Sequence, residues 1–88
     1  MQKFTCPCCG FKTLSEKPAG SYGICPICFW EDDNVQANDP DYEGGANRVS
    51  LRQAQKNFKE LGASDKRVLQ YVRKPDISDE KDPDWKLL

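Results

Sequence analysis

The sequence has no histidine and few apolar residues. Of its 88 residues, 38% are hydrophobic and 31% are charged. Because no imidazole is available as a general base, a Ser-His-Asp triad is excluded. A single domain this short and this polar lies near the lower limit at which an apolar core suffices, so we expect a second stabilising device.

Long hydrophobic runs are also lacking. No stretch of the sequence is long enough to cross a membrane, and residues 1–10 contain no apolar signal-peptide segment. We therefore expect a cytoplasmic protein without a membrane contact. In reducing cytosol, clustered cysteines are more often metal ligands than disulfides, and the odd count of five leaves one thiol unpaired in any disulfide scheme.

Four of the five cysteines form two Cys-Pro-x-Cys turns separated by 15 residues. We call them the first cysteine turn (residues 6–9) and the second cysteine turn (residues 25–28). Two intervening residues let both sulfurs of a turn point to one spot, and two such turns supply a tetrahedron of thiolates. We predict that Cys6, Cys9, Cys25 and Cys28 hold one ion, zinc in the first place. Iron is not excluded, because four thiolates also suit a mononuclear iron centre.

This ligand set favours a structural metal, since four protein ligands leave no open position for catalysis. A thioredoxin-type redox enzyme is the alternative, but its Cys-x-x-Cys motif opens a helix, whereas Gly10 and a strand-like run follow Cys9. Cys8 lies between two expected ligands and is interpreted as a small, partly buried residue. An alternate ligand or a free thiol are the other interpretations of Cys8.

Charge is unevenly distributed around a formal net charge of -1. Residues 31–47 carry six acidic groups and no basic one, and these are candidate partner contacts: Glu31, Asp32, Asp33, Asp39, Asp41 and Glu43. The segment from Asp39 matches the first half of a calcium loop, but Ser50 stands where the bidentate Glu belongs, so we favour a turn with Asx capping. Residues 48–74 carry eight basic and two acidic groups, and their candidate contacts are Arg48, Arg52, Lys56 and Lys59.

The elements follow from local patterns. Strands are expected at 4–5 and 11–14 and again around 22–30, although Phe29 stands where the first cysteine turn has Gly10, so the two backbones should differ. Residues 31–49 indicate a loop. A helix over 50–61 starts at Ser50 and stops at Gly62, and a second runs from Ser64 to about residue 74. Trp85 is expected to fold back as an anchor for the tail.

We therefore predict an α+β fold in which small zinc-ribbon-like β-hairpins pack against two helices. Residues 1–88 form a single domain, divided into metal-binding hairpins (1–31), an acidic loop (32–49), a helical part (50–74) and an acidic tail (75–88).

Several motifs together resemble a bacterial family of cysteine-rich "CPCC" proteins. They are Cys6-Pro7-Cys8-Cys9-Gly10, Cys25-Pro26-Ile27-Cys28-Phe29-Trp30-Glu31-Asp32-Asp33, Asp39-Pro40-Asp41-Tyr42, Gly44-Gly45-Ala46-Asn47 and Ser50-Leu51. The resemblance covers residues 4–62 closely, and Arg73-Lys74-Pro75 and Asp82-Pro83-Asp84-Trp85 are similar to its usual ending. It implies a small intracellular zinc-binding domain and says little about activity.

The expected function is that of a small metal-binding interaction module with a protein partner and no catalytic constellation. An immunity-type protein that offers its acidic loop to a basic enzyme is one concrete form, suggested by charge polarity and size. A nucleic-acid-binding zinc ribbon is the alternative, and it would use the basic helix and a stacking platform of aromatic side chains. The aromatic candidates are Phe4, Phe11, Tyr22, Phe29 and Trp30, which we interpret in the first place as the small core beneath the metal. A redox or iron protein is the third hypothesis. The oligomeric state cannot be derived from these patterns.

Overall fold

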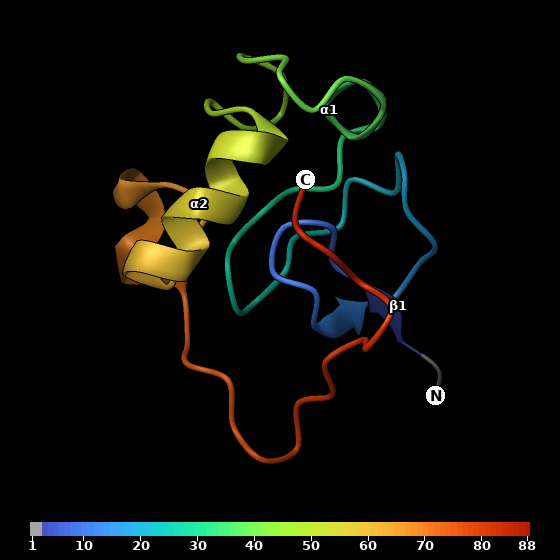
Figure 1. The fold of residues 1–88 in the computed structure, drawn as a ribbon, viewed down its shortest axis with the longest axis vertical. Coiled ribbons are helices and arrows are strands. Elements are labelled where there is room, and N and C mark those ends of the chain that lie inside the picture. Colours follow the sequence, from blue (N-terminus) through green and yellow to red (C-terminus); the bar gives the residue numbers. More distant parts are fainter. Residues whose placement is uncertain (1–2) are drawn as a thin grey trace.

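The computed structural model describes residues 3–88, and the sheet within that range is a two-stranded antiparallel hairpin. β1 (Phe4–Thr5) pairs with β2 (Lys12–Leu14), and the first cysteine turn lies between them. The chain then passes through the second cysteine turn to helix α1 (Asn34–Asn38), helix α2 (Leu51–Leu61) and a 3-10 helix, η1 (Lys66–Tyr71). The predicted α+β fold is confirmed (Figure 1).

Helix α2 confirms the predicted helix over 50–61. The Ser50 hydroxyl accepts a hydrogen bond from the Gln53 N–H at 3.1 Å, and Gly62 ends the helix in a left-handed conformation with φ of 80°. Leu51 and Ala54 are buried against the cysteine turns. At 11 residues α2 is the longest helix, and within residues 3–88 no helix has the length and apolar composition of a membrane span.

The second hairpin is shorter than predicted. Only one pair, Ile24 with Glu31, forms a β-bridge around the second cysteine turn. Tyr22 adopts a positive φ of 57°, and its N–H donates to the Asp32 carbonyl, so the backbone before Ile24 is irregular. A regular strand cannot pass through that conformation.

Two predictions about helices are corrected. The segment 31–49 was expected to be a loop, but it contains α1, which Asp33 caps. The second helix was expected to begin at Ser64, yet η1 is capped by Asp65 and ends at Tyr71. Ser64 is buried and donates its N–H to the Cys28 carbonyl at 2.8 Å, which holds it in the connection to the second cysteine turn.

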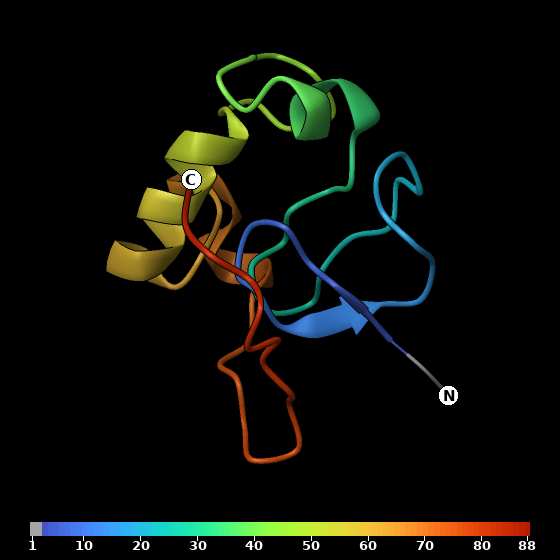
Figure 2. The ribbon, with the colours of Figure 1, turned by 45° about the vertical axis from the view of Figure 1, so that its right-hand side comes forward.

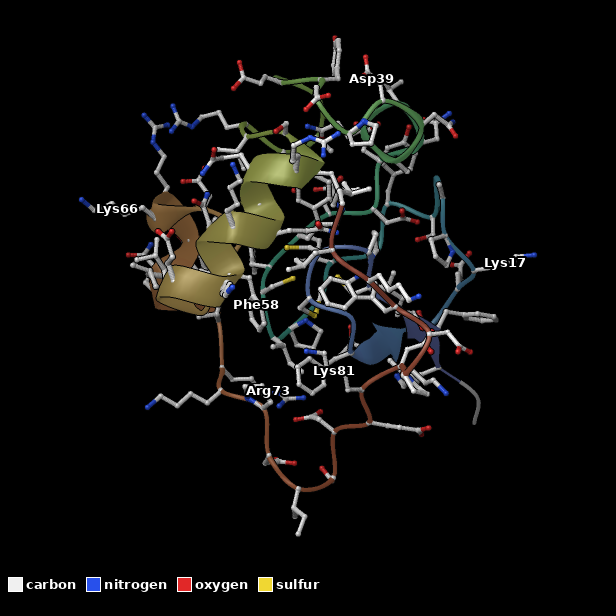
Figure 3. The ribbon with its side chains drawn as sticks, viewed as in Figure 1. Lys17, Asp39, Phe58, Lys66, Arg73 and Lys81 are labelled. Carbon is white, nitrogen blue, oxygen red and sulfur yellow. The ribbon has the colours of Figure 1, made fainter. Side chains whose placement is uncertain are left out.

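The buried core is rich in cysteine. Its ten buried members are Cys6, Cys8, Cys9, Leu14, Cys25, Ile27, Cys28, Trp30, Leu51 and Ala54. Half of these are cysteines, and their sulfur atoms gather in the middle of the molecule between α2 and the N-terminal segments (Figure 3). The core is therefore poor in large apolar side chains, as expected for a chain this short.

The chain end returns to the N-terminal part. Both ribbon views show the last residues running along the first cysteine turn and ending beside α2 (Figures 1 and 2). The Trp85 indole N–H donates to the Pro7 carbonyl at 2.9 Å, which confirms the predicted role of Trp85 as an anchor.

Candidate metal centre

The two cysteine turns have the same backbone structure. In the first, the Gly10 N–H donates to the Cys6 carbonyl at 2.9 Å, and in the second the Phe29 N–H donates to the Cys25 carbonyl at 2.8 Å. Gly10 and Phe29 both have positive φ, 81° and 65°. The prediction that Phe29 prevents an identical turn is therefore wrong.

A side chain in the left-handed region costs about 1–2 kcal/mol, so Phe29 needs compensation. Its ring stacks on Tyr71 with the ring centroids 5.0 Å apart. An offset aromatic pair of this kind contributes about 0.5–1.5 kcal/mol beyond the area that it buries. We infer that this contact with η1 offsets the strain at Phe29.

The sulfurs of Cys6, Cys9, Cys25 and Cys28 all lie within 4.8 Å of one another. The Sγ atoms of Cys6 and Cys28 are 3.6 Å apart, and those of Cys9 and Cys25 are 3.7 Å apart. A regular tetrahedron with metal–sulfur bonds of about 2.3 Å has edges of about 3.8 Å. The four sulfurs therefore fit a single tetrahedral ion, and this is the only group of three or more such ligands within residues 3–88.

The four thiols influence one another strongly. Hydrogen bonds from Cys28, Cys6 and Cys9 hold the pKa of the Cys25 thiol far below its ordinary value. The hydrogen bond with Cys25 raises the pKa of Cys6, and burial raises the pKa of Cys28. The Thr13 hydroxyl also donates to the Cys25 sulfur at 3.0 Å. Ionising all four thiols requires a cation, because adjacent buried thiolates repel one another.

The site is closed on every side. All four cysteines have no exposed surface, so a bound ion would have four protein ligands and no position open to a substrate. Cys8 is also fully buried and reduced, but it is not part of the four-sulfur group. It lies in the core as a small apolar residue, and whether it replaces a ligand stays a prediction.

The acidic residues that the sequence grouped as partner contacts do not share one surface. Asp39, Asp41 and Glu43 are exposed and Glu31 is half-buried, whereas Asp32 and Asp33 are buried. The Asp32 carboxylate accepts hydrogen bonds from the Ser21 N–H and hydroxyl at 2.9 and 2.7 Å. Both buried carboxylates accept hydrogen bonds from within the chain and have almost no exposed surface, so the prediction of a surface contact is corrected for these two.

The calcium hypothesis is not supported by the arrangement of the same loop. Asp41 forms an ion pair with Arg52, with 2.7 Å between Oδ1 and Nε, and Asp39 accepts a hydrogen bond from the Asp41 N–H in an Asx turn. The predicted capped turn is confirmed.

The basic candidates are partly neutralised. Arg52 is paired with Asp41, and the Arg48 Nε lies 3.7 Å from the Asp65 carboxylate. Lys56 and Lys59 are exposed on α2. The aromatic platform of the alternative function is not a single surface, because Trp30 is buried in the core and Phe29 is stacked on Tyr71.

Sequence reasoning missed a buried polar centre at Gln36. Its amide nitrogen lies 3.0–3.1 Å from the carbonyl oxygens of Tyr42, Asn47 and Val49, which share its two N–H donors. Its oxygen accepts from the Asn47 backbone and side chain. The Asn47 side chain in turn accepts a hydrogen bond from the Glu31 N–H and donates one to the Glu31 carbonyl. The spacing of Asp33 and Gln36 matches a capping box, and that signal could have revealed α1.

The hairpin, the helices and the four-cysteine cluster define a small α+β, zinc-ribbon-like domain that is able to bind one metal ion. Within this class the family model described as cysteine-rich CPCC matches residues 4–79. The chain belongs to that family, as the cysteine turns and the motifs after them predicted. No curated protein matches the sequence.

Proposed function

We propose that the chain is a protein-interaction module whose fold is held by one structural zinc ion at Cys6, Cys9, Cys25 and Cys28. The observation that supports this function is the closed group of four fully buried sulfurs at tetrahedral spacing. Such a site stabilises a fold and offers no coordination position for catalysis.

Metal analysis of purified protein tests the first half of the proposal. We expect colourless protein with about one zinc ion per chain. Cys9→Ser should lower the metal content, and the neighbouring Cys8→Ser is the matched control that should leave it unchanged. Coloured, iron-loaded protein would show that the ion is iron and not zinc. Wild-type protein without any metal would overturn the site.

The exposed carboxylates of Asp39, Asp41 and Glu43 support the interaction half. They lie on a segment that Gln36 fixes through hydrogen bonds to the Tyr42 and Asn47 carbonyls. A contact surface that is already ordered loses less conformational entropy on binding. A basic protein is the matching partner, and a neutralising complex with a basic enzyme is its concrete form.

The partner test uses capture from the host at two salt concentrations. A partner of this surface should bind wild-type protein, dissociate as salt rises, and be lost on Asp39→Asn plus Glu43→Gln. Glu60→Gln on α2 is the control for an exposed acid elsewhere. Binding that survives the double variant would contradict the surface. A nucleic-acid gel shift that is lost on Arg52→Glu plus Lys56→Glu would favour the alternative function.

A further inference from the structure

The C-terminal segment (residues 80–88) extends the N-terminal hairpin. The Lys12 N–H donates to the Glu80 carbonyl, and the Asp82 N–H donates to the Gly10 carbonyl, both at 2.8 Å. Phe11 and Lys81 form the β-bridge between these bonds. The Thr5 hydroxyl adds a hydrogen bond to the Asp82 carboxylate at 2.6 Å. The segment therefore lies directly along the strand that leaves the first cysteine turn.

Trp85 closes the first cysteine turn itself. A Cβ atom placed on Gly10 would lie 2.6 Å from the Trp85 ring, so the indole rests on the glycine backbone. The indole N–H donates to the Pro7 carbonyl at 2.9 Å. Pro7 stands between the expected ligands Cys6 and Cys9, which places this contact on the loop that presents two of the four sulfurs.

Gln55 joins the same loop to α2 and to the chain end. This residue is 4% exposed. Its amide nitrogen donates to the Pro7 carbonyl at 2.9 Å, and its oxygen accepts the Leu88 N–H at 2.9 Å. The Pro7 carbonyl thus receives one hydrogen bond from the helix and one from the C-terminal segment.

The two cysteine turns differ in what covers them. At the second turn, the Pro26 carbonyl accepts a hydrogen bond from the Arg73 N–H, directly after η1. At the first turn the cover is the end of the chain, which follows an exposed loop around Ile77. Residues 80–88 contain none of the helices or paired strands of the fold, so this segment can detach without pulling such an element out of place.

We propose that the C-terminal segment is a gate that controls exchange of the metal at the first cysteine turn. The inference rests on the proposed function, and it assigns Trp85 as the positioning residue of the gate. The docked segment fixes the backbone of Pro7 and Gly10, on the loop that carries Cys6 and Cys9. Its release frees that loop and opens a path to the sulfurs, so metal loss follows the population of the undocked segment. Where undocking also lowers the affinity of the site for the ion, linkage requires that a bound ion favours docking by the same factor.

The test measures the rate at which zinc-loaded, full-length protein loses zinc to an excess of a chelating dye. Trp85→Ala should accelerate release about 10–100-fold, which is the factor by which loss of outer-sphere support lowers metal affinity at other sites. Trp85→Phe keeps a ring over Gly10 but removes the hydrogen bond to Pro7. Its release rate should therefore lie between those of the wild type and Trp85→Ala. Lys86→Ala is the control, because Lys86 is an exposed neighbour of Trp85, and this variant should release zinc at the wild-type rate.

Ser50→Ala separates gating from general destabilisation. It removes the cap of α2 and lowers global stability without touching the C-terminal segment. If Ser50→Ala accelerates release as much as Trp85→Ala does, or if Trp85→Ala leaves the rate unchanged, the gate is overturned while the zinc module stands. If wild-type protein holds no metal, the proposed function itself fails.

A second readout follows the gate directly. Carboxypeptidase should remove Leu88 and Leu87 from zinc-loaded Trp85→Ala faster than from zinc-loaded wild type, because the chain end is no longer held at Gln55. Equal rates of removal would show that Trp85 does not hold the segment and would contradict the proposal.

Discussion

At the scale of single residues, two glycines share one backbone conformation in different surroundings. Gly10 has φ of 81° and Gly62 has φ of 80°, but only Gly10 has the Trp85 ring at its Cβ position. Gly62→Ala should cost about 1 kcal/mol from left-handed strain alone. Gly10→Ala should cost about 2–4 kcal/mol, because the ring must also move. Denaturant titration of the zinc-loaded proteins measures both.

A double variant isolates the contact. In the Trp85→Ala background the penalty of Gly10→Ala should fall to that of Gly62→Ala, since the obstructing ring is gone. An unchanged penalty would show that the methyl group meets something other than Trp85.

Gln36 is the second residue whose substitution should lower the unfolding free energy. Gln36→Ala leaves the Tyr42, Asn47 and Val49 carbonyls without their donor, and we expect a loss of about 2–4 kcal/mol in unfolding free energy. Gln53→Ala is the matched control, because Gln53 is exposed on α2 and should cost less than about 0.5 kcal/mol. Similar losses for both variants would refute a structural role for the buried amide.

At the scale of elements, α1 depends on one carboxylate. Asp33 Oδ1 accepts from the Val35 and Gln36 N–H groups, and Oδ2 accepts from the Ala46 N–H at 2.8 Å. Asp33→Ala should therefore cost about 2 kcal/mol, whereas Asp39→Ala on the exposed part of the same loop should cost much less. Equal costs in denaturant titration would argue against Asp33 as the cap.

The pH dependence of this effect has a defined sign. The hydrogen bond from Ala46, followed by those of α1, lowers the pKa of Asp33. A carboxylate whose folded pKa lies below its unfolded value of about 3.9 contributes its full stabilisation above that value and loses it as pH falls through the folded pKa. The difference between wild type and Asp33→Ala should thus be the same at pH 6 and pH 8. A difference that shrinks between these two pH values would contradict the lowered pKa.

The elements that could be predicted from the sequence are those whose start, apolar face and end are encoded by neighbouring residues. Helix α2 has a cap, an apolar stripe and a terminating glycine within 13 residues, from Ser50 to Gly62, so its bounds could be derived without any tertiary contact. Helix α1 has five residues, and the side chain that anchors it is the amide of Gln36 rather than an apolar group. Hydrophobic periodicity cannot detect such a helix.

The candidate site was predictable to a different degree in each part. Spacing alone identified the four sulfurs, because a Cys-x-x-Cys turn fixes where its sulfurs point. The positive φ of Phe29 was not predictable, since it is tolerated through stacking on Tyr71, 42 positions further along the chain. Burial of Asp32 likewise follows from Ser21, which no local pattern connects to it.

At the scale of the whole molecule, the secondary structure is too short to be stable alone. The strands have two and three residues, and the 11 residues of α2 fall below the length of about 12–15 at which an isolated helix is marginally stable. These elements meet at the five buried cysteines. Under the proposed function, a large part of the free energy that holds them together comes from the ion at these sulfurs.

We accordingly expect removal of zinc to unfold the chain rather than to loosen it. A chelator should abolish the near-ultraviolet circular dichroism of buried Trp30 together with the helical signal of α2, and added zinc should restore both. Chelator already saturated with zinc is the control. Because only the folded state has the site, the unfolding free energy should rise by about 1.4 kcal/mol for each tenfold increase in free zinc above the dissociation constant. Metal-free protein that keeps a dispersed NMR spectrum, or a stability that is independent of free zinc, would show that the sulfur core holds without an ion.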